Sequence, residues 1–345
     1  MTGDATAPSR RAVLAATAGV VGMCVAAPAA ARRRGSLESV LDLAMAHAST
    51  SVLVARNSGI LAERYAVGWG PERPREVASV AKSILAVLIA MAVEDGAITG
   101  FDQPAADFIP PWRDDARAQI TLGHMMSMTS GLDDAGLALR GVTGDQFAIN
   151  AAAPLRDPPG TRWAYNTAAY HLLFHVLTRA VGETLEGYAG RRLLGPLGMR
   201  HTSWIVSQGE GEQGPVTNYY SATATARDLA RFGALILGGG RWNGRRLVDA
   251  GLLGTVLSPS QELNPSYGLL WWSNARPGKD AWGRGDNLRF PSAPHDTVAA
   301  LGAGGQMLLI APSRDLVIVR QGDAPGSATL GDDLLGGALR AAGES

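Results

Sequence analysis

The run EVASVAKSILAVLIAMAV, residues 76–93, constrains the fold more than any other part of the sequence. Beyond Lys82 its apolar side chains cover every face of a helix, and such a helix has to be buried on all sides. The run stops before Gly96, a residue that suits the left-handed end of a helix. The sequence therefore predicts a central helix around which the rest of the chain packs.

A serine and a lysine stand one helical turn apart in this run. Ser79 and Lys82 share one face of the predicted helix, within reach of side-chain contact. A serine hydroxyl is a weak nucleophile that needs an adjacent base, and a neutral lysine amine can be that base. Burial lowers a lysine pKa by as much as about 3–5 units, whereas arginine is not deprotonated in proteins. This explains why a chain with 31 basic residues, of which only Lys82 and Lys279 are lysines, keeps a lysine here. Taken alone the pair is a weak motif, because Ser-x-x-Lys also arises by chance.

The N-terminus has the features of an export signal. Arg10 and Arg11 precede a weakly apolar stretch of Ala, Gly and Val, and small residues follow up to Ala31. The pattern predicts a twin-arginine signal, residues 1–31, cleaved near its end, with an uncleaved membrane anchor as the alternative. We expect a periplasmic or extracellular protein with no stable membrane insertion after cleavage. Since Cys24 lies within the signal, the mature protein would have no thiol, which excludes a cysteine nucleophile and a disulfide.

Composition and motifs exclude several other classes of protein. The 31 acidic residues balance the 31 basic ones, and no basic stripe or zinc-finger spacing is present, so nucleic acid is not an expected partner. His171 and His175 have helical spacing in HLLFH, but no acid lies between them as it does in the zinc motif HExxH. We predict packing roles for both histidines, and neither a metal nor an organic cofactor.

The order of the predicted elements indicates an α+β fold. Two strand-like runs flank a turn signal at 57–59, the part from about 100 to 255 is mainly helical, and strands return in the C-terminal part. This order predicts one antiparallel sheet built from N- and C-terminal strands, with a mainly helical inserted region. We place the domain at residues 37–342. The predicted C-terminal strands are 267–272, 307–311 and 316–321.

Six blocks of sequence, in order, extend the argument over nearly the whole mature chain. They are ASVAKSILAVLIAMAVEDGAI, ITLGHMMSMTSGL, PPGTRWAYNTAAYHLLFHVL, LLGPLGM, ATARDLARFG and GAGGQMLLIAPSRDLVIVR. In these blocks the chain resembles the serine β-lactamase and penicillin-binding-protein superfamily. The resemblance is to the branch with class C β-lactamases, family VIII carboxylesterases and 6-aminohexanoate-dimer hydrolases. It implies a β-lactamase/transpeptidase-like fold.

The resemblance also implies roles for individual residues. Ser79 would be acylated by the substrate, and Lys82 would help to remove its proton. Tyr165, in WAYNTAAY, matches the tyrosine that completes the proton relay; the alternative is an ordinary core aromatic. The amide that often follows that tyrosine falls at Thr167 in this chain, which makes Thr167 a candidate for substrate binding.

Like Thr167, a second position differs from the pattern of the family. The Lys-Thr-Gly strand of penicillin-recognising enzymes is absent from this chain. Matching the glycine pair 304–305 to the pair after that motif puts Ala299 at the position of its lysine. Gly302 then falls where a backbone N–H completes the oxyanion hole with that of Ser79. Gln306 follows the glycine pair and is a second candidate for substrate binding, ahead of Trp271 and Trp272.

We therefore expect an exported serine hydrolase that cleaves esters or small amides through an acyl-enzyme. Its partner is a small-molecule substrate, and the sequence does not predict an oligomeric state. The missing lysine usually meets a substrate carboxylate, which argues against efficient binding of β-lactams. Two alternatives remain: a D,D-peptidase or β-lactamase, and a non-catalytic binding protein on the same scaffold.

Overall fold

The computed structural model describes residues 36–56, 59–137 and 143–343. Within these residues, the larger sheet has six strands in the order β2-β1-β11-β10-β9-β8, each antiparallel to its neighbours. N-terminal strands thus pair directly with C-terminal ones, which confirms the predicted sheet. The strands are β1 (Ser49–Arg56), β2 (Gly59–Tyr65), β8 (Trp272–Ser273), β9 (Val298–Gly302), β10 (Gln306–Ala311) and β11 (Leu316–Gly322).

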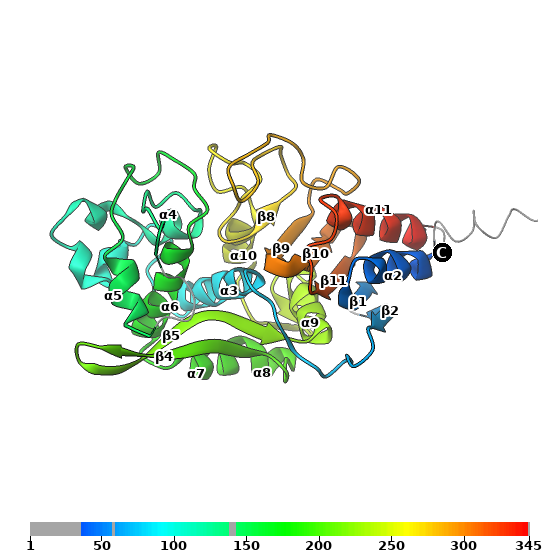
Figure 1. The fold of residues 1–345 in the computed structure, drawn as a ribbon, viewed down its shortest axis with the longest axis horizontal. Helices are drawn as coiled ribbons and strands as arrows, with labels where there is room; N and C mark the ends of the chain where they lie inside the picture. Colours follow the sequence, from blue (N-terminus) through cyan, green and yellow to red (C-terminus); the bar gives the residue numbers. More distant parts are fainter. Residues whose placement is uncertain (1–35, 57–58, 138–142, 344–345) are drawn as a thin grey trace, which may run out of the picture.

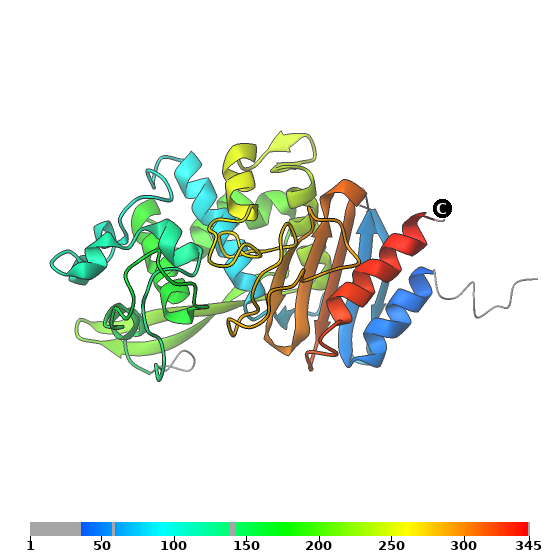
Figure 2. The ribbon, with the colours of Figure 1, turned by 90° about the horizontal axis from the view of Figure 1, so that it is seen from above.

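Helices cover both faces of this sheet. α2 (Leu37–Ala46) and α11 (Leu330–Gly343) lie side by side across one face (Figure 2). On the other face, α9 (Ala226–Leu237) packs against β1, β10 and β11. Because neither face is left to solvent, β10 and β11 are nearly continuous apolar runs instead of alternating apolar and polar residues.

The predicted central helix is α3 (Val80–Glu94), and every residue from Val80 to Ala92 is buried. It passes between the sheet and the helical region, in contact with β9, α6 (Thr167–Val181) and α10 (Ala250–Leu257) (Figure 1). The left-handed φ of 75° at Gly96 confirms the predicted helix end. α3 therefore carries its N-terminal residues to the junction between the two parts of the fold.

The inserted region is mainly helical, as predicted, but its secondary structure is broken into short pieces. Four 3₁₀ or π-helical turns accompany the α-helices. The α-helices not yet named are α4 (Leu122–Met126), α5 (Gln146–Ala151), α7 (Leu185–Ala189) and α8 (Gly195–Leu197), and the turns are η1 (Ala105–Asp107), η2 (Pro110–Trp112), η3 (Ala116–Gln119) and η4 (Gly190–Leu194).

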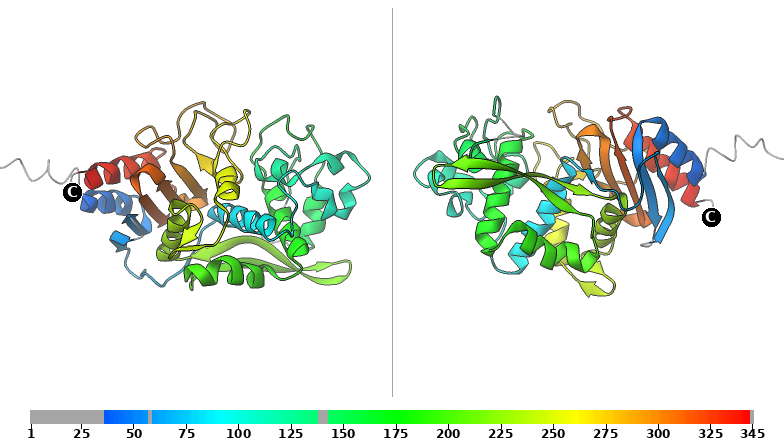
Figure 3. Two further views of the ribbon diagram at one scale, coloured as in Figure 1. Left: turned by 180° about the vertical axis from the view of Figure 1, so that it is seen from behind. Right: turned by 60° about the horizontal axis from the view of Figure 1, so that its bottom comes forward.

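A long β-ribbon, which the sequence analysis did not predict, accompanies the helices of the inserted region. β4 (Ser203–Gly211) and β5 (Gly214–Ala224) pair along their whole lengths, and Figure 3 shows them running along the helical side toward the sheet. β5 also pairs with β3 (Arg75–Glu76), the segment that leads into α3. A second hairpin joins β6 (Arg241–Trp242) to β7 (Arg245–Arg246). The ribbon is polar and half exposed, so it has little of the hydrophobic periodicity by which strands are recognised.

A smaller correction concerns the predicted strand at 267–272. Regular pairing there is limited to Trp272 and Ser273, because Leu270 has a left-handed φ of 62° that interrupts the strand. The η5 (Ala303–Gly305) and η6 (Pro312–Arg314) turns close the two hairpins that follow.

No helix in the part of the chain that the structure describes is both long and apolar enough to cross a membrane. The predicted export signal, residues 1–31, lies outside the described residues and stays a prediction.

Candidate active site

The turn before α3 sets the position of Ser79. Ala78 has a left-handed φ of 48°, which is unfavourable for a residue with a Cβ. The buried Val77 holds this turn in place, because its N–H donates to the carbonyl of Ala222 in β5 at 2.9 Å. Ser79 then occupies the N-cap position of α3 without capping the helix with its hydroxyl. Its Oγ is left available for other partners.

Those partners are the lysine and the tyrosine predicted from the sequence. Lys82 Nζ donates to Ser79 Oγ at 3.1 Å and lies 5.2 Å from the ring centroid of Tyr165, whose phenol is near enough to Ser79 for the serine to lower its pKa. Lys82 is 3% exposed, and its Nζ lies 4.0 Å from the ring centroid of Tyr170. The structure thus brings Ser79, Lys82 and Tyr165 together, whereas their catalytic roles stay predictions.

Burial of the phenol determines the protonation state of Tyr165. It raises the pKa of Tyr165 to about 12, although the hydrogen bond from Ser79 opposes this shift. At neutral pH the residue is therefore a phenol and not a phenolate. It can pass on or donate a proton, but it does not begin the reaction as the base.

We expect Tyr165→Phe to lower kcat about 100-fold or more, because the relay loses the phenol hydroxyl while the ring is kept. Steady-state kinetics on a p-nitrophenyl ester would measure the loss, with circular dichroism to confirm the fold. Tyr219→Phe is the control, since that hydroxyl bonds Glu186 on the exposed surface. A Tyr165→Phe rate within a fewfold of wild type would exclude the relay role.

The edge of β9 approaches the nucleophile from the sheet side. A Cβ on Gly302 would collide with the carbonyl oxygen of Val77 and lie 3.1 Å from the Ser79 nitrogen. Only glycine allows the strand to come this near, which explains the residue type at this position.

The direction of the peptide groups in β9 bears on the expected oxyanion donor, Gly302, whose role stays a prediction. The N–H of Asn274 donates to the carbonyl of Thr297, so this carbonyl points to the β8 side of β9. From Thr297 onward the residues of the strand direct their N–H and C=O groups alternately to the β8 side and to β10, and no register shift interrupts the alternation. The N–H of Gly302 therefore points to β10. The N–H groups of Leu301 and Ala303 point to the β8 side of the strand, which makes these two residues further candidates for the donor that joins Ser79.

Two neighbouring alanines of β9 stand at or next to the predicted position of the missing lysine. Ala299 and Gly302 are three residues apart, so their side chains point to opposite faces of the sheet. The face of Ala299 is that of Leu301, which lines a cavity with Met307 under α11. Ala300 shares the face of Gly302. It is also small and apolar, so no cation is supplied from this strand position.

The two candidates for substrate binding lie in different surroundings. Thr167 is the first residue of α6, half-buried, and its N–H donates to Asp134 Oδ2 at 2.7 Å. Gln306 is buried in the sheet, where its amide donates to the Gly322 carbonyl at 2.7 Å and accepts from the Gly322 N–H at 3.3 Å. The contacts of Gln306 are therefore structural ones, whereas Thr167 stays a candidate.

Asn166 also has a structural explanation. Its Oδ1 accepts from the Ala169 N–H at 2.7 Å as the N-cap of α6, and its Nδ2 donates to the Leu132 carbonyl at 2.8 Å. The amide next to Tyr165 thus fixes the start of the helix that follows the tyrosine.

An aromatic cluster supports Tyr165 from the far side. Trp272 stacks on its ring at 6.2 Å between centroids, and Tyr267 meets it edge-on at 6.3 Å. Arg289 lies over Trp272 at 3.8 Å, and burial lowers its pKa to about 10. Sequence reasoning named Trp272 but missed Tyr267 and Arg289, which belong to no motif. Trp271 instead packs in the core against Phe232. Phe232 belongs to α9, the helix labelled in Figure 1.

The two histidines of HLLFH have packing environments. His171 Nδ1 is 2.9 Å from Gln146 Nε2, and burial lowers the pKa of His175 to about 4. In the ranges that the structure describes, no group of three His, Cys, Asp or Glu side chains could hold a metal ion.

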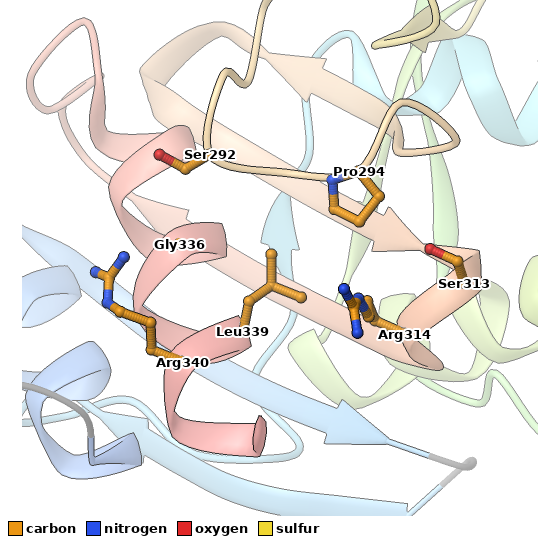
Figure 4. Close-up of a pocket in the computed structure, with 7 residues that line it drawn as sticks. All are labelled: Ser292, Pro294, Ser313, Arg314, Gly336, Leu339 and Arg340. Carbon is orange, nitrogen blue, oxygen red and sulfur yellow. The ribbon is translucent and has the colours of Figure 1, made fainter. Parts of the chain in front are cut away.

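Two cavities of similar size lie on different parts of the molecule. One, of about 510 Å³, is lined by Tyr165 and by the loop of Lys279. The other, of about 520 Å³, lies between α11 and the 292–294 segment, with Arg314 and Arg340 at opposite ends (Figure 4). Its serines are engaged by carboxylates: Ser292 donates to Asp332 and Ser313 to Asp296. It contains no residue of the predicted site.

Comparison with known proteins agrees with this arrangement. A family model described as Beta-lactamase matches residues 37–334. The 6-aminohexanoate-dimer hydrolase of Paenarthrobacter ureafaciens is 25% identical over 307 residues, which cover 79% of this chain and 72% of that protein. Esterase EstB of Burkholderia gladioli is 30% identical over 155 residues, 39% of each chain. The solved structure of a class C β-lactamase mutant superposes with a TM-score of 0.67 at 17% identity, covering 88% of this chain and 96% of that one. The predicted β-lactamase/transpeptidase-like fold is thereby confirmed.

Proposed function

Because the chain belongs to the Beta-lactamase family, we propose that it is a serine hydrolase that cleaves esters or small amides through an acyl-enzyme on Ser79. The observation that carries the proposal is the hydrogen bond between Lys82 and Ser79 beside the Tyr165 ring. Lys82 Nζ lies 3.1 Å from Ser79 Oγ and 5.2 Å from the centroid of that ring. A nucleophile within reach of its base is the arrangement that acyl transfer needs.

The reaction begins when the neutral amine of Lys82 takes the proton of the Ser79 hydroxyl. Oγ then forms a bond to the substrate carbonyl carbon, and the negative charge on the carbonyl oxygen is met by the N–H of Ser79 and a second N–H from the edge of β9. Tyr165 donates its proton to the leaving alcohol or amine as that bond breaks, and Lys82 returns a proton to Tyr165. Water, activated by the same groups, releases the acid and restores Ser79.

Esters and small amides are favoured over penicillins because of the strand next to the nucleophile. Ala299, at the position where the resemblance implies a lysine, and its neighbour Ala300 are both small and apolar, so neither brings a charge to a β-lactam carboxylate. The intact Ser79, Lys82 and Tyr165 set argues against a non-catalytic binding protein, the remaining alternative.

Covalent labelling followed by a substrate panel tests the proposal. We expect a fluorophosphonate to label Ser79, as read by mass spectrometry of the digested protein, and p-nitrophenyl esters or short ω-amino-acid amides to be turned over faster than nitrocefin. Penicillin labelling with slow ester turnover would instead indicate a D,D-peptidase. A protein that neither reagent labels would refute the hydrolase proposal.

We also infer export through the twin-arginine signal, from Arg10 and Arg11 and the small residues up to Ala31. N-terminal sequencing of protein recovered outside the cytoplasm tests this inference. A mature protein beginning near residue 32 would support it, and an intact Met1 on cytoplasmic protein would contradict it.

A further inference from the structure

We propose that Arg320, in β11, is a positioning residue for the proposed reaction: it holds the turn between β9 and β10 and thereby the strand edge beside Ser79. The inference rests on the proposed function and deepens it, because it gives a role in that reaction to a residue that does not touch the substrate. Arg320 is fully buried although it carries a charge. Its strand, β10 and β9 are consecutive in the larger sheet (Figure 2).

The guanidinium of Arg320 donates its hydrogen bonds to uncharged oxygen atoms. Two of them belong to the turn after β9, where Nη1 donates to the Gly304 carbonyl at 3.0 Å and to the Gly305 carbonyl at 2.7 Å. The remaining acceptors, which lie in chain segments before β1, at its start and after β11, are the His47 carbonyl, Ser49 Oγ at 2.8 Å and the Ala324 carbonyl at 2.8 Å. One side chain thus ties the turn to both ends of the described chain.

The sheet is built to admit this buried charge. In the described part of the chain Arg320 forms no ion pair, and Asp323 pairs with Arg75 instead. Hydrogen bonds therefore have to replace the hydration that a buried cation loses. A Cβ at Gly305 would lie 2.1 Å from Arg320 Nη1, and one at Gly322 would lie 2.4 Å from its Cζ. Only glycine at both positions leaves room for the guanidinium.

The turn that Arg320 binds would be loose without outside contacts. Gly304 and Gly305 have left-handed φ values of 75° and 76°. Glycine loses more conformational freedom on folding than any other residue, so two in succession have to be held by other groups. The carbonyls of these two glycines are the ones that accept from Arg320. Gln306 secures the next residue through its two bonds to Gly322.

This turn determines where the edge of β9 lies relative to the nucleophile. It directly follows Gly302, at which a Cβ would lie 2.4 Å from the Val77 carbonyl oxygen and 3.1 Å from the Ser79 nitrogen. Regular pairing of β9 with β8 ends at Ala299, so the strand beyond it depends on β10 and on the turn. The candidates for the second oxyanion donor all lie at 301–303. A donor stabilises an oxyanion only when it is held in place before the charge develops.

Hydrogen exchange tests the positioning itself, independently of activity. Arg320→Met removes the guanidinium and keeps a long apolar side chain. We expect the amides of 301–306 to exchange about tenfold faster or more in this variant, as read by mass spectrometry of the digested protein. Asp228→Asn is the matched control, because Asp228 is also a fully buried charge whose acceptor bonds, to His201 N–H and the Thr202 hydroxyl, hold a different turn. It should leave exchange at 301–306 unchanged.

Kinetics test the consequence for the proposed reaction. We expect Arg320→Met to lower kcat on p-nitrophenyl butyrate about 10- to 100-fold and to change KM less than about threefold, because the oxyanion exists only in the transition state. Affinity for phenylboronic acid should fall by a similar factor, since its tetrahedral adduct with Ser79 places an oxygen where the oxyanion forms. Arg320→Lys should lose only about 3- to 10-fold in kcat, because an ammonium still donates to a carbonyl of the turn. Asp228→Asn should keep the kcat of wild type.

Each outcome supports or overturns the assignment. Faster exchange at 301–306 together with the loss in kcat supports it. Unchanged exchange in a folded Arg320→Met protein overturns it, and so does faster exchange with wild-type kcat, which would show that the turn is held for stability alone. In both cases the hydrolase proposal stands.

Two further results are decisive. If Arg320→Met does not fold, Arg320→Lys carries the same measurements, and wild-type exchange and kcat in that variant would overturn the role of Arg320. If wild-type protein cleaves no ester and a fluorophosphonate does not label Ser79, the proposed function falls, and this inference falls with it.

Discussion

Ser79→Ala should lower ester or amide turnover by on the order of 10⁴-fold or more, because no acyl-enzyme can form without the hydroxyl. The fold should survive, since Ser79 is half-buried at the start of α3 and its side chain caps no helix. Steady-state kinetics on the best substrate of the panel measure the first effect, and thermal unfolding measures the second.

Ser83→Ala provides the control in the same helix. Ser83 is buried one turn further along α3, where its hydroxyl donates to the Leu270 carbonyl at 2.7 Å. Its loss should lower the free energy of unfolding by about 1 kcal/mol while turnover is kept. If the Ser79→Ala protein retained most of its activity, the nucleophile would have to be a different residue.

Lys82→Arg should be nearly as damaging as Lys82→Ala, with a loss of about 10²- to 10⁴-fold in kcat. The proposed base has to be neutral when it takes the Ser79 proton, and a guanidinium does not deprotonate in proteins. Arginine keeps the positive charge over the Tyr170 ring, so the variant separates basicity from charge. Initial rates on a p-nitrophenyl ester, with circular dichroism for both variants, supply the comparison.

An arginine variant with near-wild-type turnover would show that Lys82 acts only through its charge. Tyr165 would then be the remaining candidate for the base, and its high pKa would have to fall in the substrate complex. A pH-rate profile of that variant, rising toward alkaline pH, would identify the tyrosine as the group that titrates.

The parts of the site that the sequence predicted are those encoded by local spacing. Ser79 and Lys82 are one turn apart in a helix that is apolar on all faces, and both the helix and the contact follow from that pattern. Tyr165 lies far away in the chain and has no local spacing to Ser79. It was found only because its segment resembles a motif of a known family.

The register of β9 shows where sequence reasoning fails. Side chains and peptide groups alternate along a strand, so an error of one residue moves a side chain to the other face and an N–H to the other edge. Two glycines in the sequence did not fix this register. The close approach of Gly302 to Val77 and the bond from Asn274 to Thr297 did, and both depend on tertiary structure.

The cavity residues were not predictable for a different reason. Lys279 and Trp282, which line the cavity beside Tyr165, lie in a loop without hydrophobic periodicity. Tyr267, which packs against Tyr165 outside that lining, comes from a segment with little regular pairing. Their positions depend on side-chain bonds such as that from Asn264 Nδ2 to the Lys279 carbonyl at 3.2 Å. Bonds of this kind leave no periodic pattern in the sequence.

The sheet that joins the two ends of the chain has a consequence for how the protein folds. β1 pairs with β11, and β9, which completes the site beside Ser79, follows almost the whole helical insertion. Closing so long a loop is entropically slow, whereas the turns of α3 can form locally. During synthesis, a chain that has emerged only as far as α10 therefore carries its serine, lysine and tyrosine but no strand edge opposite them. The proposed catalytic site is therefore completed late in folding, when the last strands pair.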